Sequence, residues 1–414
     1  MSLTSIALIA YIAIGVIGYY LGRQRAVASV QGDTRVLHSV PAFHGWNVVL
    51  WALQPAFLLL LVWFILKPAL VQLLPAGASE WVADSAGPIV TVFALLMALA
   101  GAVFGLSRIA PQYRARNVVE QMIRVLLVLC AVVAIATTAG IVLSLLFESA
   151  RFASMYPLGD FLFGKTWAPQ AGGGDFSRMG ILPLLWGTIY ISLIALIVSV
   201  PIGLFAAVYM SEYAGPRVRG FAKPLIEVLA GIPTIVYGLF ALATIGPMLR
   251  DAIASPLGLS NSGSSVMTAG LVMGFMLIPF VSSLSDDIIN AVPQSLRDGS
   301  LGLGSTHSET VTKVVLPAAL PGIVGAILLA ASRAIGETMI VVLGAGVAAQ
   351  ISMNPFESMT TITSRIVSQL TGDGSFDSPE TLVAFALALT LFIMTLALNV
   401  FALYIVRKYR EQYE

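Results

Sequence analysis

Two opposite charges stand four residues apart in an otherwise apolar part of the chain. Arg333 and Glu337 lie within AILLAASRAIGETMIVVLGAG, residues 326–346. A charge at the centre of a lipid bilayer costs on the order of 3 kcal/mol on insertion scales, so such residues usually pair with each other or mark a transport pathway. If the segment is helical, a spacing of four places both side chains on one face.

This pair of charges has two interpretations. It could be structural, an Arg–Glu pair that locks helices together. Alternatively, Arg333 could line a path for anions, because a forked guanidinium suits an oxyanion, and Glu337 would keep the binding weak enough for the ion to leave. The residue types and their spacing leave both interpretations open.

A second segment could dock another protein. Residues 294–321 read QSLRDGSLGLGSTHSETVTKVVLPAALP, a polar and glycine-rich stretch that ends in two Leu-Pro pairs. Gly302 and Gly304 would let another protein's surface approach closely, and the Leu-Pro pairs predict a sharp helix entry. On composition alone, an ordinary loop is the alternative.

A third segment matches a nucleotide-binding loop in its sequence pattern but not in its context. GDFLFGKT, residues 159–166, fits G-x-x-x-x-G-K-[ST], which needs a strand before it and a helix that opens at its lysine. Here Pro157 stands just upstream, and Pro169 and three glycines follow, which opposes a helix. We interpret the match as a coincidence and expect this chain to bind no nucleotide.

Other classes of function find little support. The three histidines are scattered, without the spacing of metal ligands, and neither H-E-x-x-H nor G-x-S-x-G occurs. The net charge of +1 gives no reason to expect nucleic acid as a partner. Cys130 is the single cysteine, so no disulfide can form within one chain. We expect no cofactor, no metal and no enzymatic activity.

The composition is that of a multi-spanning membrane protein. Of 414 residues, 58% are hydrophobic and 10% are charged, whereas soluble domains carry roughly 25% charged residues. Nine stretches are long enough to cross a bilayer, which needs about 20 apolar residues per helix. They are approximately 2–22, 46–66, 88–107, 122–147, 181–210, 224–247, 266–285, 316–345 and 382–406. We therefore expect an all-α, polytopic fold, with the first stretch a retained span rather than a signal peptide.

Two of these stretches should not be straight helices. The eighth, 316–345, is too long and too rich in glycine for one span, which predicts a break or an oblique helix. Pro224 and Pro233, within 211–242, predict a kinked helix; such a kink could serve close packing or act as a hinge.

The distribution of basic residues predicts the orientation. With the N-terminus outside and the C-terminus in the cytoplasm, fifteen Lys and Arg residues fall in cytoplasmic loops and six in outer loops. Cytoplasmic loops carry the excess of basic residues. Three connections are then long: 148–180 and 346–381 outside, and 286–315 inside. We predict two domains, an extension of three helices over 1–116 and a core of six helices over 117–414.

The inner loop resembles the EAA loop of type I ABC-importer permeases, whose pattern is E-A-A, then Gly, then Leu-Pro at fixed spacing. The matching residues here are Asp298, Gly299, Ser300, Gly304, Leu316 and Pro317. The acid is one methylene shorter, and Gly299 lowers helix propensity by about 1 kcal/mol relative to alanine.

Within that superfamily, residues 117–414 are similar to the phosphate-specific permeases. SEYAGPRVR, GIPTIVYGLF and SRAIGETM are marks of that subfamily, and FLFGKTWAP with FSRMGILPLLWGT favours the PstC type over the PstA type. The shorter relatives lack residues 1–116.

The resemblance implies a permease subunit of an importer in the bacterial inner membrane. Its partners would be a PstA-type sister permease, two copies of a PstB-type cytoplasmic ATPase, which alone uses ATP and Mg²⁺, and a periplasmic PstS-type phosphate-binding protein. Arg333 and Glu337 match charges linked in the family to phosphate passage, with Ser332 and Thr338 as weaker hydroxyl partners. The alternatives are a permease for another oxyanion and a secondary transporter or channel that works alone.

Overall fold

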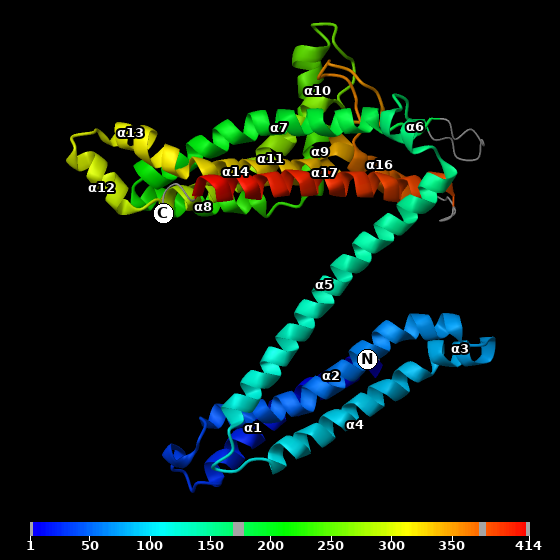
Figure 1. The fold of residues 1–414 in the computed structure, drawn as a ribbon, viewed down its shortest axis with the longest axis vertical. Helices are drawn as coiled ribbons and strands as arrows, with labels where there is room; N and C mark the ends of the chain where they lie inside the picture. Colours follow the sequence, from blue (N-terminus) through cyan, green and yellow to red (C-terminus); the bar gives the residue numbers. More distant parts are fainter. Residues whose placement is uncertain (1–2, 169–177, 372–377, 411–414) are drawn as a thin grey trace. The chain divides into compact units, whose positions relative to one another are not determined.

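Helices make up all regular elements of the part of the chain that the structure describes. A computed structural model describes residues 3–168, 178–371 and 378–410 (Figure 1). Nine of its helical stretches are long and apolar enough to cross a membrane, which confirms the expected all-α, polytopic fold. Outside the helices, one isolated antiparallel bridge joins Trp167 to Met179.

The chain divides into two compact units, residues 1–139 and 140–414. The division falls inside helix α5 (Ala115–Met155), which covers the fourth expected span. The first unit therefore includes the beginning of that span as well as the three spans before it.

Unit 1 packs helices through small residues. Its long helices are α1 (Leu3–Ala28), α2 (Pro41–Leu73) and α4 (Ala86–Ser107), and the short α3 (Ala76–Asp84) precedes α4. A Cβ atom added to Gly101 of α4 would lie 2.1 Å from the carbonyl oxygen of Trp51 on α2. Small residues allow such close backbone approach, which is the usual basis of helix packing inside a membrane.

Unit 2 is built around helix α11 (Val266–Asn290), its most buried candidate span. Helix α11 packs along α7 (Leu182–Val208) and α14 (Leu316–Ile335), and α14 packs against α17 (Pro379–Arg410) (Figure 1). Gly270 and Gly274 of α11 lie against Ile194 and Val198 of α7, where an added Cβ would approach within 2.8 Å.

The kinked helix expected within 211–242 is wrong, because the structure has two separate helices there. Helix α8 (Pro216–Ala230) ends before Gly231, and α9 (Thr234–Phe240) begins after Pro233. Proline cannot donate a helical hydrogen bond and disfavours helical conformation in the residue before it. The candidate span consequently runs over 234–254, continuing through two π-helical turns and α10 (Gly246–Leu249), and excludes α8.

The two ends of unit 2 carry different short helices. Helices α12 (Gln294–Gly302) and α13 (His307–Thr310) lie at one end. Helices α6 (Leu158–Phe163) and α16 (Ile362–Leu370) lie toward the opposite end (Figure 1). In the GDFLFGKT segment a helix ends at Phe163, before Lys165, whereas a nucleotide loop has its helix begin at that lysine.

Candidate transport and coupling sites

The predicted break in the eighth stretch lies directly beside Arg333 and Glu337. Helix α14 ends at Ile335, Gly336 forms its C-cap, and α15 (Met339–Gly344) begins three residues later. The expected break is confirmed. The expectation that Arg333 and Glu337 share one helical face is wrong, because the helix stops two residues before Glu337.

Arg333 and Glu337 do not pair with each other. In the described part of the chain neither residue takes part in an ion pair within 4.0 Å. The exposed guanidinium of Arg333 lies 5.8 Å from the ring centre of Phe280 on α11. The Glu337 carboxylate accepts the backbone N–H of Met339 at 3.1 Å and so holds the start of α15. The interpretation as a structural Arg–Glu pair therefore fails in this structure.

The two hydroxyl candidates occupy different surroundings. Ser332 donates to Oδ1 of Asn399 on α17 at 2.8 Å, so it contributes to helix packing. Thr338 stands in the break itself and lies 3.4 Å from the carbonyl oxygen of Gly336. The break also contacts α16, because Thr363 donates to the carbonyl oxygen of Glu337 at 2.9 Å. Their roles in transport stay predictions.

The predicted docking segment contains a formed helix. Asp298, Gly299 and Ser300 all lie within α12, and Gln294 donates to the Asp298 carboxylate one turn away at 3.0 Å. The Ser300 hydroxyl lies 2.9 Å from that of Thr310 on α13. Leu316 and Pro317 stand at the start of α14. The sharp helix entry predicted there is wrong, because the helical stretch already begins at His307 and reaches Leu316 through α13 and a π-helical turn.

Gly304 is required by the backbone and not by a close neighbour. Its φ of +87° lies in the left-handed region that favours glycine. A Cβ atom there would meet no atom within 4 Å. The glycine reverses the chain between α12 and α13, and the surface around it is open within this chain.

A buried ion pair fixes α12 against the rest of unit 2. Arg297 of α12 donates to the Glu212 carboxylate at 3.0 Å, and their side chains are 13% and 6% exposed. The same guanidinium donates to the carbonyl oxygens of Ile289 and Val292 at the end of α11, at 2.8 and 2.5 Å. His307 lies with Nε2 3.0 Å from the carbonyl oxygen of Glu212.

A second charge cluster joins α8 to α11. The Asp286 side chain is fully buried and accepts from Arg219 at 3.1 Å and from Lys223 at 2.8 Å. Asn290 donates to the same carboxylate at 2.9 Å. Lys223 also lies 3.5 Å from Asp287. The hydrogen bond to Asp286 raises the pKa of Lys223, because it favours the charged ammonium.

Sequence reasoning missed both of these clusters. In the sequence, the only prediction to use Arg219, Lys223 and Arg297 was the orientation of the chain in the membrane. No role was predicted for Glu212 or Asp286. A carboxylate at the end of an apolar stretch, as Asp286 is in α11, is the signal that was available. Its partners lie 63 and 67 residues away in the chain.

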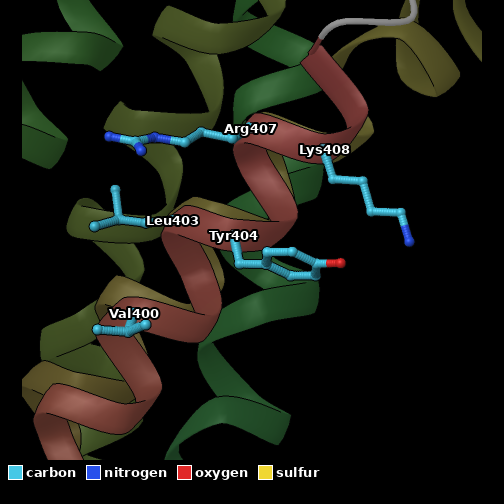
Figure 2. A pocket seen from close by; sticks show the side chains of 5 residues that line it. All are labelled: Val400, Leu403, Tyr404, Arg407 and Lys408. Atoms are coloured by element: carbon cyan, nitrogen blue, oxygen red, sulfur yellow. The ribbon is translucent and has the colours of Figure 1, made fainter.

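The last turns of α17 present a surface pocket of about 490 Å³ (Figure 2). In Figure 2 Val400, Leu403 and Arg407 point to one side of the helix, and Tyr404 and Lys408 to the other. The Lys408 ammonium lies 5.8 Å from the Tyr404 ring centre. Aromatic and basic side chains at the end of a span are typical of a membrane–water interface.

Residues of metal-binding type do not cluster within the described ranges: no group of three or more His, Cys, Asp or Glu residues could hold an ion there.

Comparison with known proteins gives two family matches. Residues 199–411 match the model of the binding-protein-dependent transport system inner membrane component. Residues 8–85, within unit 1, match a model described as a phosphate ATP-binding cassette transporter.

Curated relatives are similar over most of their own length. The phosphate transport system permease protein PstC of Pasteurella multocida is 32% identical over 70% of this chain and 93% of its own. PstC of Mesorhizobium japonicum is 30% identical over 67% and 87%, respectively. The probable ABC transporter permease protein YqgH of Bacillus subtilis is 28% identical over 70% and 91%.

Proposed function

We propose that this chain, which belongs to the family of binding-protein-dependent transport system inner membrane components, is the subunit through which an ATP-driven importer moves inorganic phosphate into the cell. Two kinds of finding support this proposal. Relatives named as phosphate permeases cover most of the chain, and the charge of Arg333 stands uncompensated beside a helix break.

The proposed phosphate binding rests on the guanidinium of Arg333, which has no carboxylate partner in the described chain. Arg333 has no ion-pair partner in the described chain, and the ring of Phe280 covers one side of it. Phosphate would supply the missing negative charge and accept forked hydrogen bonds from Arg333. Interruptions in membrane helices commonly carry substrate sites, because they free polar backbone groups. Thr338 supplies such a group here through its hydroxyl, which stands in the break. The N–H groups of Gly336 and Glu337 already donate to the carbonyl oxygens of Ser332 and Ala334.

The end of unit 2 that carries α12 would dock the cytoplasmic ATPase. Arg297 and Glu212 connect α12 rigidly to the ends of α7 and α11, so a movement of α12 would be passed to the helices that surround the path. The mechanism requires inward- and outward-open states that ATP and the loaded binding protein favour differently. The chain itself would provide no ATPase site, and the partner subunits would use the ATP and Mg²⁺.

The assembly would be a heteromeric complex in the bacterial inner membrane. It would contain a sister permease, two ATPase copies and an external phosphate-binding protein, with the N-terminus of this chain outside and its C-terminus in the cytoplasm. The α12 end of unit 2 would then face the cytoplasm and the α16 end the outside.

Co-purification and reconstitution test the proposal. The tagged chain should bring down an ATPase and a second permease, and the complex in proteoliposomes should take up phosphate only with ATP and loaded binding protein. Phosphate uptake by the purified chain alone, without a co-purifying ATPase, would instead identify a free-standing transporter. Uptake of sulfate or molybdate in preference to phosphate would identify a permease for another oxyanion.

A further inference from the structure

Arg365 lies on a short helix that contacts the break next to Arg333. Helix α16 begins after Thr361, whose hydroxyl accepts the backbone N–H of Ser364 at 3.3 Å. In its first turn Thr363 donates to the carbonyl oxygen of Glu337. Arg365 follows two residues later and donates through one Nη to the carbonyl oxygen of Val347. Helix α16 thus touches the chain both at the break and beyond α15.

Arg365 differs from every comparable cation of unit 2. Among the described Lys and Arg side chains of this unit, those withdrawn at least partly from solvent are Arg151, Arg219, Lys223, Arg250, Arg297 and Arg365. All but Arg365 have a carboxylate partner. The Nε of Arg365 is closed to solvent and has no acceptor in the described structure.

Burying an arginine without a carboxylate partner costs free energy. Removing a charge from water carries a penalty that a neighbouring opposite charge normally offsets. Burial accordingly lowers the pKa of Arg365, and no carboxylate of the described residues opposes the effect. An anion that visits the site would compensate the charge during its stay.

We propose that Arg365 is a second binding residue for the transported oxyanion, placed between the outer end of unit 2 and the Arg333 segment. The inference rests on the proposed function and adds a residue to its path. Thr363 holds α16 to the backbone of Glu337, and Arg365 lies two residues further along this helix, where it reaches the chain beyond α15 at Val347. Two cations in succession would let phosphate pass from one to the other without leaving the path.

A small anion fits Arg365 better than a carboxylate on another protein. The Nε is closed to solvent and one Nη donates to Val347, so an anion would bind at the other Nη. A free oxyanion presents several acceptor oxygens and can reorient there, whereas a partner's carboxylate is held in place by its own backbone. A carboxylate of the sister permease is the competing occupant, and the experiment separates the two.

The test uses the whole complex in proteoliposomes with its binding protein. Arg365→Gln, Arg365→Lys and the control Arg178→Gln, an exposed arginine of unit 2, are compared for phosphate uptake and for ATP hydrolysis stimulated by the loaded binding protein. Removing a hydrogen bond to a charged group should lower the maximal uptake rate of Arg365→Gln about tenfold. Stimulated ATP hydrolysis should stay within about twofold, Arg365→Lys should recover part of the uptake, and Arg178→Gln should match the wild type.

Two results would overturn this role for Arg365. Unchanged uptake in Arg365→Gln would remove it from the path. A parallel loss of uptake, stimulated ATP hydrolysis and co-purifying sister permease would make Arg365 a clamp or an interface contact. If the wild-type complex takes up no phosphate, the proposed function itself is refuted. Uptake by the wild type is therefore measured before any variant is compared.

Discussion

The arginines of two charged regions of unit 2 differ in whether a carboxylate neutralises them. At the α12 end, Arg219 and Arg297 are each held by a buried carboxylate, Asp286 and Glu212. Near the helix break and α16, Arg333 and Arg365 lack a carboxylate in the described chain. A cation that is already neutralised can fix helices but cannot attract an anion. A cation without a partner can attract an anion but stabilises little by itself.

This contrast suggests a division of labour within one helical core. The compensated charges would make the α12 end stiff, as a segment that transmits force must be. The uncompensated charges would keep the path receptive to a passing anion. Substitutions in the two regions should therefore affect different measurements, stability in the first and transport in the second.

The largest effect on stability should come from Asp286→Asn. The amide would leave Arg219 and Lys223 without their shared carboxylate. Removing one partner of a buried pair costs about 3–5 kcal/mol, and the loss here should lie at the lower end of that range, because the two cations are 34% and 30% exposed. Thermal unfolding of the purified complex in detergent should show a clear loss of stability. Asp287→Asn is the matched control, because the Asp287 side chain is 66% exposed and exposed ion pairs contribute little. Equal stability of the two variants would contradict the structural role of Asp286.

Arg333→Ala should affect transport and spare assembly. Losing a charged hydrogen-bonding group is worth about 1.5–3 kcal/mol, a factor of roughly 10 to 150 in uptake rate. The complex should still co-purify with the same thermal stability, because Arg333 holds no other helix through an ion pair in the described chain. Arg333→Lys keeps the positive charge but loses the forked guanidinium, so its uptake rate should lie between those of the wild type and Arg333→Ala. A complex that no longer assembles would restore the structural interpretation of this residue.

Much of the helical framework could be predicted from local sequence. Apolar length alone located the spans approximately, except that it began the sixth too early by including part of α8, and the glycines around Gly336 indicated the break in the eighth. The family pattern at 298–317 located α12, although the effect of Gly299 on the helix could not be judged from propensity. The helix forms there because α13 and the anchor of Arg297 to Glu212 add to the weak local preference.

The charge clusters could not be predicted in the same way, because their members meet only in the fold. Glu212 and Arg297 are 85 residues apart, and neither stands in a pattern that names the other. From the sequence, Arg365 was only one basic residue of an outer loop. That it has no carboxylate partner among the described residues is visible only in the fold. Pro233 was visible, yet whether a proline kinks a helix or divides it depends on packing.

The smallest expected effect is on ATPase binding, when two glycines of the docking segment are each replaced by alanine. Both Gly299 and Gly304 have open space around the position of an added Cβ, so neither substitution to alanine should cause a clash. They differ in backbone conformation: Gly299 lies inside α12, whereas Gly304 has a φ of +87°.

Gly299→Ala should stabilise α12 by about 1 kcal/mol, and Gly304→Ala should destabilise the turn after it by about 1 kcal/mol. If the ATPase binds only permease in which α12 is formed, and α12 is largely unformed in the free permease, the dissociation constant should change by up to about fivefold in opposite directions. The measurement is a titration of the labelled ATPase against permease in nanodiscs. Equal changes in both variants would mean that the ATPase recognises the glycines themselves, and no change in either would place the docking surface elsewhere.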